Sequence, residues 1–180
     1  MFQHVTVLRD EAVQALNIRP DGIYVDCTLG GAGHSSLIAS KLGPDGLLIA
    51  LDQDDAALAS GRERLSAYSG RVRIEKSNFR HLRAVLERLQ VPMRGGIPQV
   101  DGVLFDLGVS SPQLDEAERG FSYNQDAELD MRMDRSTRLT AKTIVNEWEA
   151  DDIARILFEY GEEKFSRRIA KAIVDARKSR

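Results

Sequence analysis

Four short strand-like segments alternate with helix-like segments over the first 107 residues of the chain. The strand-like segments lie at residues 23–27, 47–51, 72–76 and 100–107. The helix-like segments between them lie at residues 35–41, 56–65 and 82–89. Strands and helices in this alternation form βαβ units with parallel strands. The run at 47–51 is apolar throughout, which is typical of a strand buried on both faces. The sequence therefore predicts an α/β fold with an open parallel sheet.

The rest of the chain differs in character. A helix at residues 10–18, with Asp10 as its N-cap, precedes the first strand, and residues 91–99 are expected to form a loop rich in Pro and Gly. After Gly108 the sequence is polar and irregular. From Thr140 it is helical, with two apolar stripes and Gly161 as a C-cap between them. We therefore expect two domains, residues 1–114 and 115–180, the second one helical.

The predicted sheet is incomplete. Its fourth strand would lie near the middle of an open sheet, and nothing after it in the sequence covers its outer side. The last helical segment stops at residues 176–180 without a capping glycine or proline. The sequence is therefore expected to be a fragment truncated at its C-terminus. The alternative is a small α/β domain with a helical tail.

Composition excludes several classes of protein. Hydrophobic residues make up 42% and charged residues 29% of the 180, as in soluble globular proteins, and no apolar run approaches the roughly 18 residues of a membrane span. The N-terminus lacks the basic start and apolar core of a secretion signal. One cysteine and three scattered histidines predict neither disulfides nor a metal site. A cytoplasmic location without membrane contact is expected.

The net charge of −3 is unevenly distributed. Residues 164–180 hold seven Lys or Arg and one Asp, whereas the rest of the chain holds 18 basic and 27 acidic residues. A basic end of this kind is suited to contact with phosphates, but many solvated helix faces have the same composition.

The stretch VDCTLGGAGHS, residues 25–35, begins in the first strand and runs beyond it. Its glycines, Gly30, Gly31 and Gly33, would let a ligand lie on the backbone at the carboxyl end of the sheet. A dinucleotide site requires G-x-G-x-x-G, but the sixth position counted from Gly31 is Ser36. An acid, a short spacer and spaced glycines fit S-adenosylmethionine better. A structural turn is the remaining alternative.

Asp52 lies at the carboxyl end of the second strand, 22 residues after Gly30. A carboxylate there can accept hydrogen bonds from both ribose hydroxyls of an adenosine. The alternative role of a helix cap is already available to Asp54 or Asp55. After the third strand, Phe79 would lie near the adenine, although a phenylalanine is more often a core residue.

The fourth strand ends in FDLGVSSPQL, which brings further residues to the same edge of the sheet: Asp106, Ser110, Ser111, Pro112 and Gln113. The lone pair of an exocyclic base amine is delocalised into the ring, so acceptors that hold its two hydrogens favour its attack on a methyl donor. The sequence therefore suggests Asp106, Ser110, Ser111 and Pro112 as catalytic residues. A plain turn at Ser-Ser-Pro is the alternative.

Together, VDCTLGGAGHS, ALDQD, FDLGVSSPQLDEAERGFSY and LDMRMD resemble the bacterial small-subunit ribosomal RNA cytosine-N4 methyltransferases, the MraW or RsmH family. The resemblance runs from His4 through the YGEEKFSRRIAKAI segment and so covers nearly the whole chain. Family members continue further, with more strands, which agrees with the expected truncation.

The resemblance implies a class I, Rossmann-like methyltransferase fold with an inserted helical domain. It implies S-adenosylmethionine as donor and, as acceptor, the N4 amine of a cytidine in the decoding region of 16S ribosomal RNA. The cofactor-binding residues that it implies, together with the glycines above, are Ala32, Gly33, His34, Asp52, Phe79, Asp106 and Gln113. The partner is the small ribosomal subunit, which basic residues within 115–180 would grip. The oligomeric state is open, with a dimer as one option.

Two other functions stay open from the residues alone. One is a nucleotide-dependent oxidoreductase, which the imperfect glycine pattern disfavours. The other is a non-catalytic RNA-binding piece that uses the basic helix. His34 is expected to line the cofactor site without acting as a base, and Cys27 to be a buried strand residue.

Overall fold

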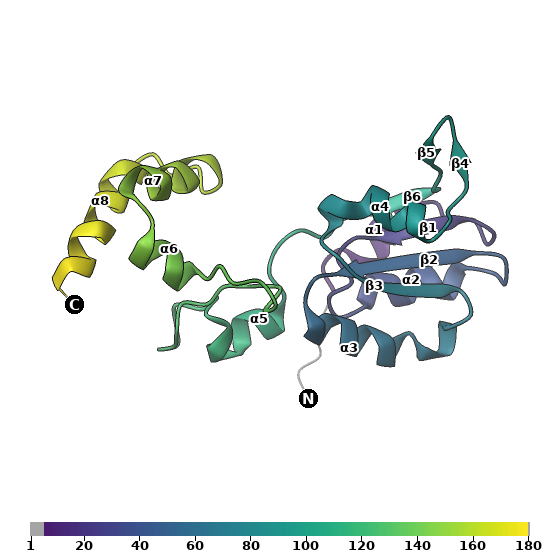
Figure 1. The fold of residues 1–180 in the computed structure, drawn as a ribbon. Coiled ribbons are helices and arrows are strands. Elements are labelled where there is room, and N and C mark those ends of the chain that lie inside the picture. Colours follow the sequence, from purple (N-terminus) through teal and green to yellow (C-terminus); the bar gives the residue numbers. More distant parts are fainter. Residues whose placement is uncertain (1–5, 180) are drawn as a thin grey trace. The chain divides into compact units, whose positions relative to one another are not determined.

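The computed structural model describes residues 6–179 and is drawn in Figure 1. The chain divides into two compact units, Met1–Ser111 and Pro112–Arg180. The change of unit falls within the short helix α5 (Ser111–Asp115). The domain boundary expected from the sequence, between residues 114 and 115, lies near the end of this helix.

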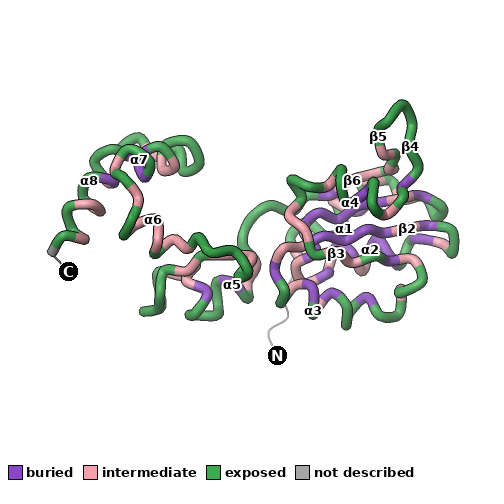
Figure 2. The backbone as a smooth tube through the Cα atoms, in the orientation of Figure 1, coloured by how far each residue is buried: buried purple, intermediate pink, exposed green. Residues whose placement is uncertain are grey.

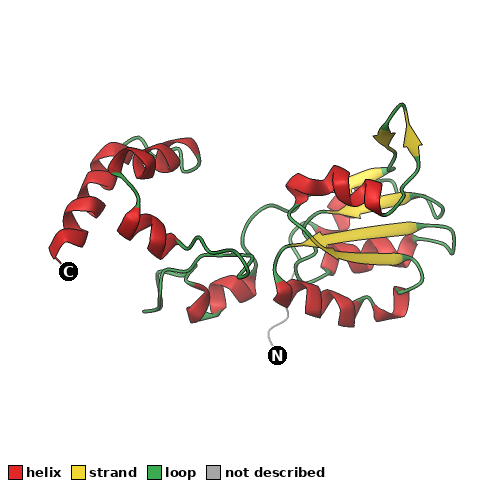
Figure 3. Cartoon of the chain, viewed as in Figure 1, coloured by secondary structure: helices red, strands yellow, loops and turns green. Residues whose placement is uncertain are grey.

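The first unit alternates strands and helices, as Figure 3 shows. Its strands are β1 (Ile23–Asp26), β2 (Leu47–Asp52), β3 (Val72–Lys76), β4 (Met93–Arg94), β5 (Ile97–Pro98) and β6 (Gly102–Leu104). Its α-helices are α1 (Arg9–Ala15), α2 (Gly33–Lys41), α3 (Asp55–Arg64) and α4 (Leu82–Arg88), and its short 3-10 helices are η1 (Ser66–Tyr68) and η2 (Phe79–His81).

The main sheet has the order β3-β2-β1-β6 with all neighbours parallel. This confirms the predicted α/β class, and the order is that of the first four strands of a Rossmann-like sheet. β2 and then β3 lie on one side of β1, and β6 lies on the other side of β1. In such sheets, ligands bind at the carboxyl ends of the strands beside this reversal of direction.

Helices cover both faces of the sheet. On one face, Val13 of α1, Ile38 of α2 and Leu58 of α3 pack against buried strand residues such as Leu48 and Ala50. On the other face, Val85 and Leu86 of α4 pack against Val25, Ile49 and Leu51. Successive residues of β2 therefore contribute to different cores, and Figure 2 shows its central residues buried. This explains why residues 47–51 have no polar alternation.

Four local predictions were wrong. Residues 91–99 include a hairpin, β4–β5, because Gly95 and Gly96 both adopt the positive φ that a two-residue hairpin turn needs. β6 pairs only over residues 102–104, opposite the end of β1. Helix α1 starts at Arg9 after a left-handed Leu8, so Asp10 lies inside it. The C-cap of α7 (Ala150–Glu159) is Tyr160 and not the predicted Gly161, and the residue with a positive φ after this helix is Glu162.

The second unit is helical with a small core of its own. Its α-helices after α5 are α6 (Ala141–Glu147), α7 (Ala150–Glu159) and α8 (Ser166–Ala176), and its 3-10 helices are η3 (Ala117–Arg119) and η4 (Arg177–Ser179). Ile153 and Ala154 of α7 and Ala170 of α8 are buried against each other. Within residues 6–179, no helix has the length and apolarity to cross a membrane.

Candidate functional site

The carboxyl ends of the four parallel strands carry most of the residues that the sequence singled out. Asp26 ends β1, Asp52 ends β2, Phe79 follows β3, and Asp106 follows β6. The glycine loop leaves β1 and enters α2 at Gly33. Parallel strands bring these segments to one edge of the first unit.

The glycine loop is tightly shaped. Gly30 has φ 47° and Ala32 has φ 59°, both in the left-handed region. Ala32 is completely buried and pays a conformational cost there, which is a kind of strain that often occurs at ligand-binding loops. Gly33 has no space for a side chain, because a Cβ atom built on it would lie 1.8 Å from Thr6 Oγ1. Gly31 has more room, with Arg64 Nη1 at 3.5 Å from such an atom.

The Asp52 carboxylate is fixed by two backbone amides. Gly30 N donates to Oδ2 at 2.9 Å, and Asp54 N donates to Oδ1 at 2.9 Å. A carboxylate has about four lone-pair positions, so acceptor capacity remains on both oxygens. The helix-capping role belongs to Asp54, whose Oδ1 accepts from Ala56 N at 3.0 Å. Asp52 is therefore available for a ligand and is tied directly to the glycine loop.

A second carboxylate, Asp26, is fully buried beneath the loop. Ser35 Oγ donates to its Oδ2 at 2.6 Å, and Thr28 N donates to its Oδ1 at 3.0 Å. Burial raises the pKa of Asp26 above its ordinary value, while these hydrogen bonds act in the opposite direction. The sequence placed Asp26 at the strand end but did not show that Thr28 and Ser35 hold it. The Ser35 contact joins β1 to α2, so no local sequence pattern marks it.

His34 faces Asp106 but is enclosed by protein. The residue is 5% exposed, and its Nε2 lies 3.2 Å from the Val7 carbonyl oxygen. A carbonyl only accepts, so this contact places the proton on Nε2. Nδ1 lies 3.8 Å from Asp106 Oδ2, beyond hydrogen-bond distance, and half of the Asp106 side chain is exposed. The arrangement suits His34 for lining a site more than for exchanging protons with a ligand.

Phe79 packs edge-on against Phe105, with the ring centroids 5.5 Å apart and the planes at 89°. Both rings remain partly exposed, at 38% and 49%. An aromatic ring with free surface at this edge can contact a flat ligand such as a purine.

The Ser-Ser-Pro-Gln segment is divided between the two units. Ser110 and Ser111 are the last residues of the first unit, whereas Pro112 and Gln113 belong to the second. Gln113 is buried and Pro112 exposed. At the strand ends, the structure pairs Gly30 with Asp52 and places His34 beside Asp106. Participation of Pro112 and Gln113 at the same site stays a prediction.

Cys27 is a poor nucleophile in this setting. It is 3% exposed, and burial raises the pKa of its thiol to about 12, with the Asp26 charge adding to the effect. Among the residues that the structure describes, no group of three or more His, Cys, Asp or Glu side chains is placed to hold a metal ion.

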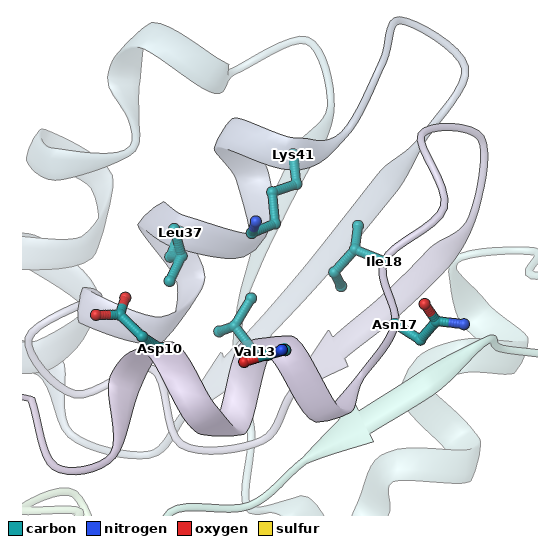
Figure 4. A pocket seen from close by; sticks show the side chains of 7 residues that line it. Asp10, Val13, Asn17, Ile18, Leu37 and Lys41 are labelled. Atoms are coloured by element: carbon teal, nitrogen blue, oxygen red, sulfur yellow. The ribbon is translucent and has the colours of Figure 1, made fainter.

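A pocket lies elsewhere on the first unit, between α1 and α2 (Figure 4). Val13, Ile18 and Leu37 are apolar residues of its lining, and Asp10 and Lys41 are charged ones. None of its lining residues is among the site residues that the sequence predicts. The strand-end residues therefore remain the better candidate for chemistry.

Comparison with known proteins agrees with the motifs. The model of the MraW methylase family matches residues 1–180. A protein named Ribosomal RNA small subunit methyltransferase H from Brevibacillus brevis is 67% identical over 177 residues, covering 98% of this chain and 54% of its own length. Proteins of the same name are 65% identical in Paenibacillus sp., over 99% of this chain and 57% of theirs, and 61% identical in Exiguobacterium sibiricum, over 98% and 54%.

This chain thus spans about half the length of the curated relatives that it matches. The family model nevertheless covers every residue of it, including the glycine loop, Asp52 and the segment after β6. The chain belongs to the MraW methylase family.

Proposed function

We propose that this chain is the cofactor-binding part of an S-adenosylmethionine-dependent methyltransferase that acts on small-subunit ribosomal RNA. The acceptor that we propose is the N4 amine of a cytidine in the decoding region of 16S ribosomal RNA. Family membership and the names of the relatives support the reaction and the kind of RNA. The residues at the strand ends support the position of the cofactor.

The hydrogen bond from Gly30 N to Asp52 Oδ2 carries the assignment of the site. This bond joins the glycine loop, whose backbone can lie against the ligand, to the Asp52 carboxylate, which would accept hydrogen bonds from the ribose hydroxyls. One ligand can therefore contact both. Phe79 and Phe105 would provide aromatic surface for the adenine, and the buried His34 would line the site next to the glycine loop.

The residues fit an adenosine-containing, phosphate-free cofactor. No Lys or Arg is among the residues proposed to contact it, and Asp52 and Asp106 are acidic. This suits ribose hydroxyls and the positive charges of a methionine sulfonium better than a pyrophosphate. When bound, S-adenosylmethionine supplies an electrophilic methyl group on a sulfonium sulfur.

The protein's part in such a transfer is to align the two reactants, because the reaction is an in-line displacement. The half-exposed Asp106 carboxylate would accept a hydrogen from the cytidine amine and so favour attack by its nitrogen. Ser110, Ser111 and Pro112 would shape the loop that receives the base, and Gln113 would complete the cofactor pocket.

The second unit is proposed to contact RNA through α8. Arg167, Arg168 and Lys171 are exposed on this helix. Lys171 is paired with Asp175 at 2.9 Å, and the Arg168 guanidinium lies 4.7 Å from the centre of the Phe165 ring. Guanidinium and aromatic groups together can contact both phosphates and unpaired bases.

Calorimetry with S-adenosylhomocysteine on the full-length protein tests the cofactor site. Asp52→Ala should weaken binding by about tenfold or more, because charge-assisted hydrogen bonds are lost. Asp55→Ala is the matched control, since Asp55 is exposed and pairs with Lys76 at 2.7 Å outside the proposed site. Equal binding by the wild-type and Asp52→Ala proteins would rule out the site.

Two further arms address the other functions. Binding of a nicotinamide dinucleotide in place of S-adenosylhomocysteine would favour an oxidoreductase. A non-catalytic RNA-binding protein would transfer no methyl group even as wild type. Its crosslinking to small-subunit RNA would survive Asp106→Ala but would be lost when residues 164–180 are removed.

A further inference from the structure

Thr28 bridges the ends of two strands where their backbone pairing stops. The last backbone contact between β1 and β6 at this end runs from Cys27 N to Leu104 O, at 2.9 Å. Two residues further along the second segment, Asp106 N donates to Thr28 Oγ1 at 2.8 Å. A side-chain hydroxyl thus takes the place of the next backbone acceptor and joins residues 78 positions apart.

The Thr28 hydroxyl, which accepts the hydrogen bond from the Asp106 amide, is itself oriented by Asp26. Thr28 Oγ1 lies 3.4 Å from Asp26 Oδ1 and can donate to it, while Thr28 N donates to the same oxygen at 3.0 Å. Asp26 is fully buried and anchored on its other oxygen by Ser35. A hydroxyl has one proton and two lone pairs. When Thr28 Oγ1 donates its proton to Asp26, its lone pairs stay available as acceptors, and the Asp106 amide donates to one of them.

The bridge lies at the reversal of strand order. β1 and β6 are the neighbours on either side of that point, where sheets of this kind bind ligands. Beyond the bridge, the Asp106 carboxylate stands 3.8 Å from His34 Nδ1, and the other ring nitrogen of His34 is occupied by the Val7 carbonyl. Within residues 6–179, Asp106 lies beyond the strand pairing of β1 and β6, and its backbone amide is held by the Thr28 hydroxyl.

We propose that Thr28 is a positioning residue, whose hydroxyl, oriented by the buried Asp26, holds the Asp106 backbone so that its carboxylate faces the glycine loop and the reacting groups. This rests on the proposed function, because it acts through the role assigned there to Asp106. A threonine at this position contacts neither cofactor nor substrate in the proposal.

Thr28→Val tests the hydroxyl, because valine keeps the branched shape and removes both hydrogen-bonding functions. In the full-length protein, we expect about tenfold weaker binding of S-adenosylhomocysteine by calorimetry. Thr28→Ser keeps the hydroxyl and should bind within about twofold of wild type. Hydrogen–deuterium exchange at the Asp106 amide should be faster in Thr28→Val and near normal in Thr28→Ser, with no cofactor analogue present.

A double-mutant cycle separates positioning from general structural support. If Thr28 acts through Asp106, Thr28→Val should have no further effect on binding in an Asp106→Ala background. The same loss in both backgrounds, or wild-type binding by Thr28→Val, would overturn the role of Thr28 and leave the proposed function standing. Failure of the unsubstituted protein to bind would overturn both. If Thr28→Val does not fold, Thr28→Ala takes its place in the same experiments, and its results are judged by the same criteria.

Discussion

Gly33 is the position in the glycine loop that has least room for a side chain. Gly33→Ala would place Cβ against Thr6, so either the residue 6–8 segment or the loop must move. We expect the free energy of unfolding to fall by about 1–3 kcal/mol, as for other overpacked sites. Gly31→Ala is the control, because its Cβ would make an ordinary contact. Thermal unfolding of the two variants compares them, and equal stability would contradict the packing described for Gly33.

Asp130 provides a pH-dependent contribution in the second unit. Arg132 donates to both its oxygens, at 2.8 and 2.7 Å, and these hydrogen bonds lower the pKa of Asp130 to about 2. The folded pKa is depressed, so the stabilisation is present above the ordinary value near 4 and is lost as the pH falls from 4 towards 2. Solvent screening limits it to about 1–2 kcal/mol.

Asp130→Asn should therefore lower stability at pH 7 and flatten the change between pH 4 and 2. Urea unfolding followed by the fluorescence of Trp148, the single tryptophan of the chain, measures this in the second unit. Asp126→Asn, at an exposed position in the same segment, should behave as wild type. A pH slope that Asp130→Asn leaves unchanged would show that the ion pair does not contribute.

Among the elements, α3 shows how one aspartate is chosen from several. The sequence offered Asp54 or Asp55 as its cap, and Asp54 accepts from Ala56 N. Asp54→Ala should lower stability by about 1 kcal/mol through loss of the cap. Asp55→Ala removes an exposed ion pair with Lys76 and a negative charge in the first turn of the helix, and should cost less, about a few tenths of a kcal/mol. Chemical denaturation would decide, and a larger loss in Asp55→Ala would reverse the assignment.

Strand boundaries were most predictable where a local pattern reflects burial. β2 matches its predicted range to within one residue, because its continuous apolar run reflects cores on both faces. β3 also matches its predicted range, although Val72 is its only buried residue and the others are half-buried or exposed. β6 is shorter than the strand predicted for it, since its pairing ends with that of β1. The β4–β5 hairpin was missed because two residues per strand leave no measurable periodicity.

For the whole molecule, each of the two units has hydrophobic packing of its own, which implies two separable responses to mutation. Ile153 is 1% exposed in the core of α7 and α8, and Ile49 is completely buried in β2. Ile153→Ala should destabilise the second unit by about 2–4 kcal/mol, read by Trp148 fluorescence. Ile49→Ala should instead speed hydrogen exchange in β1 and β2. Loss of protection in both units from either variant would show a single cooperative core.

The sequence by itself determined the α/β class, the glycine loop at the first strand end, the acid at the second and the family. These depend on short-range patterns, in which burial on both faces and close backbone approach restrict consecutive residues. Only the tertiary structure decided that Gly30 binds Asp52, that Thr6 fills the space above Gly33, and that Thr28 holds Asp106. Each of these pairs joins segments from 22 to 78 residues apart, and folding alone brings such segments within hydrogen-bond or packing distance.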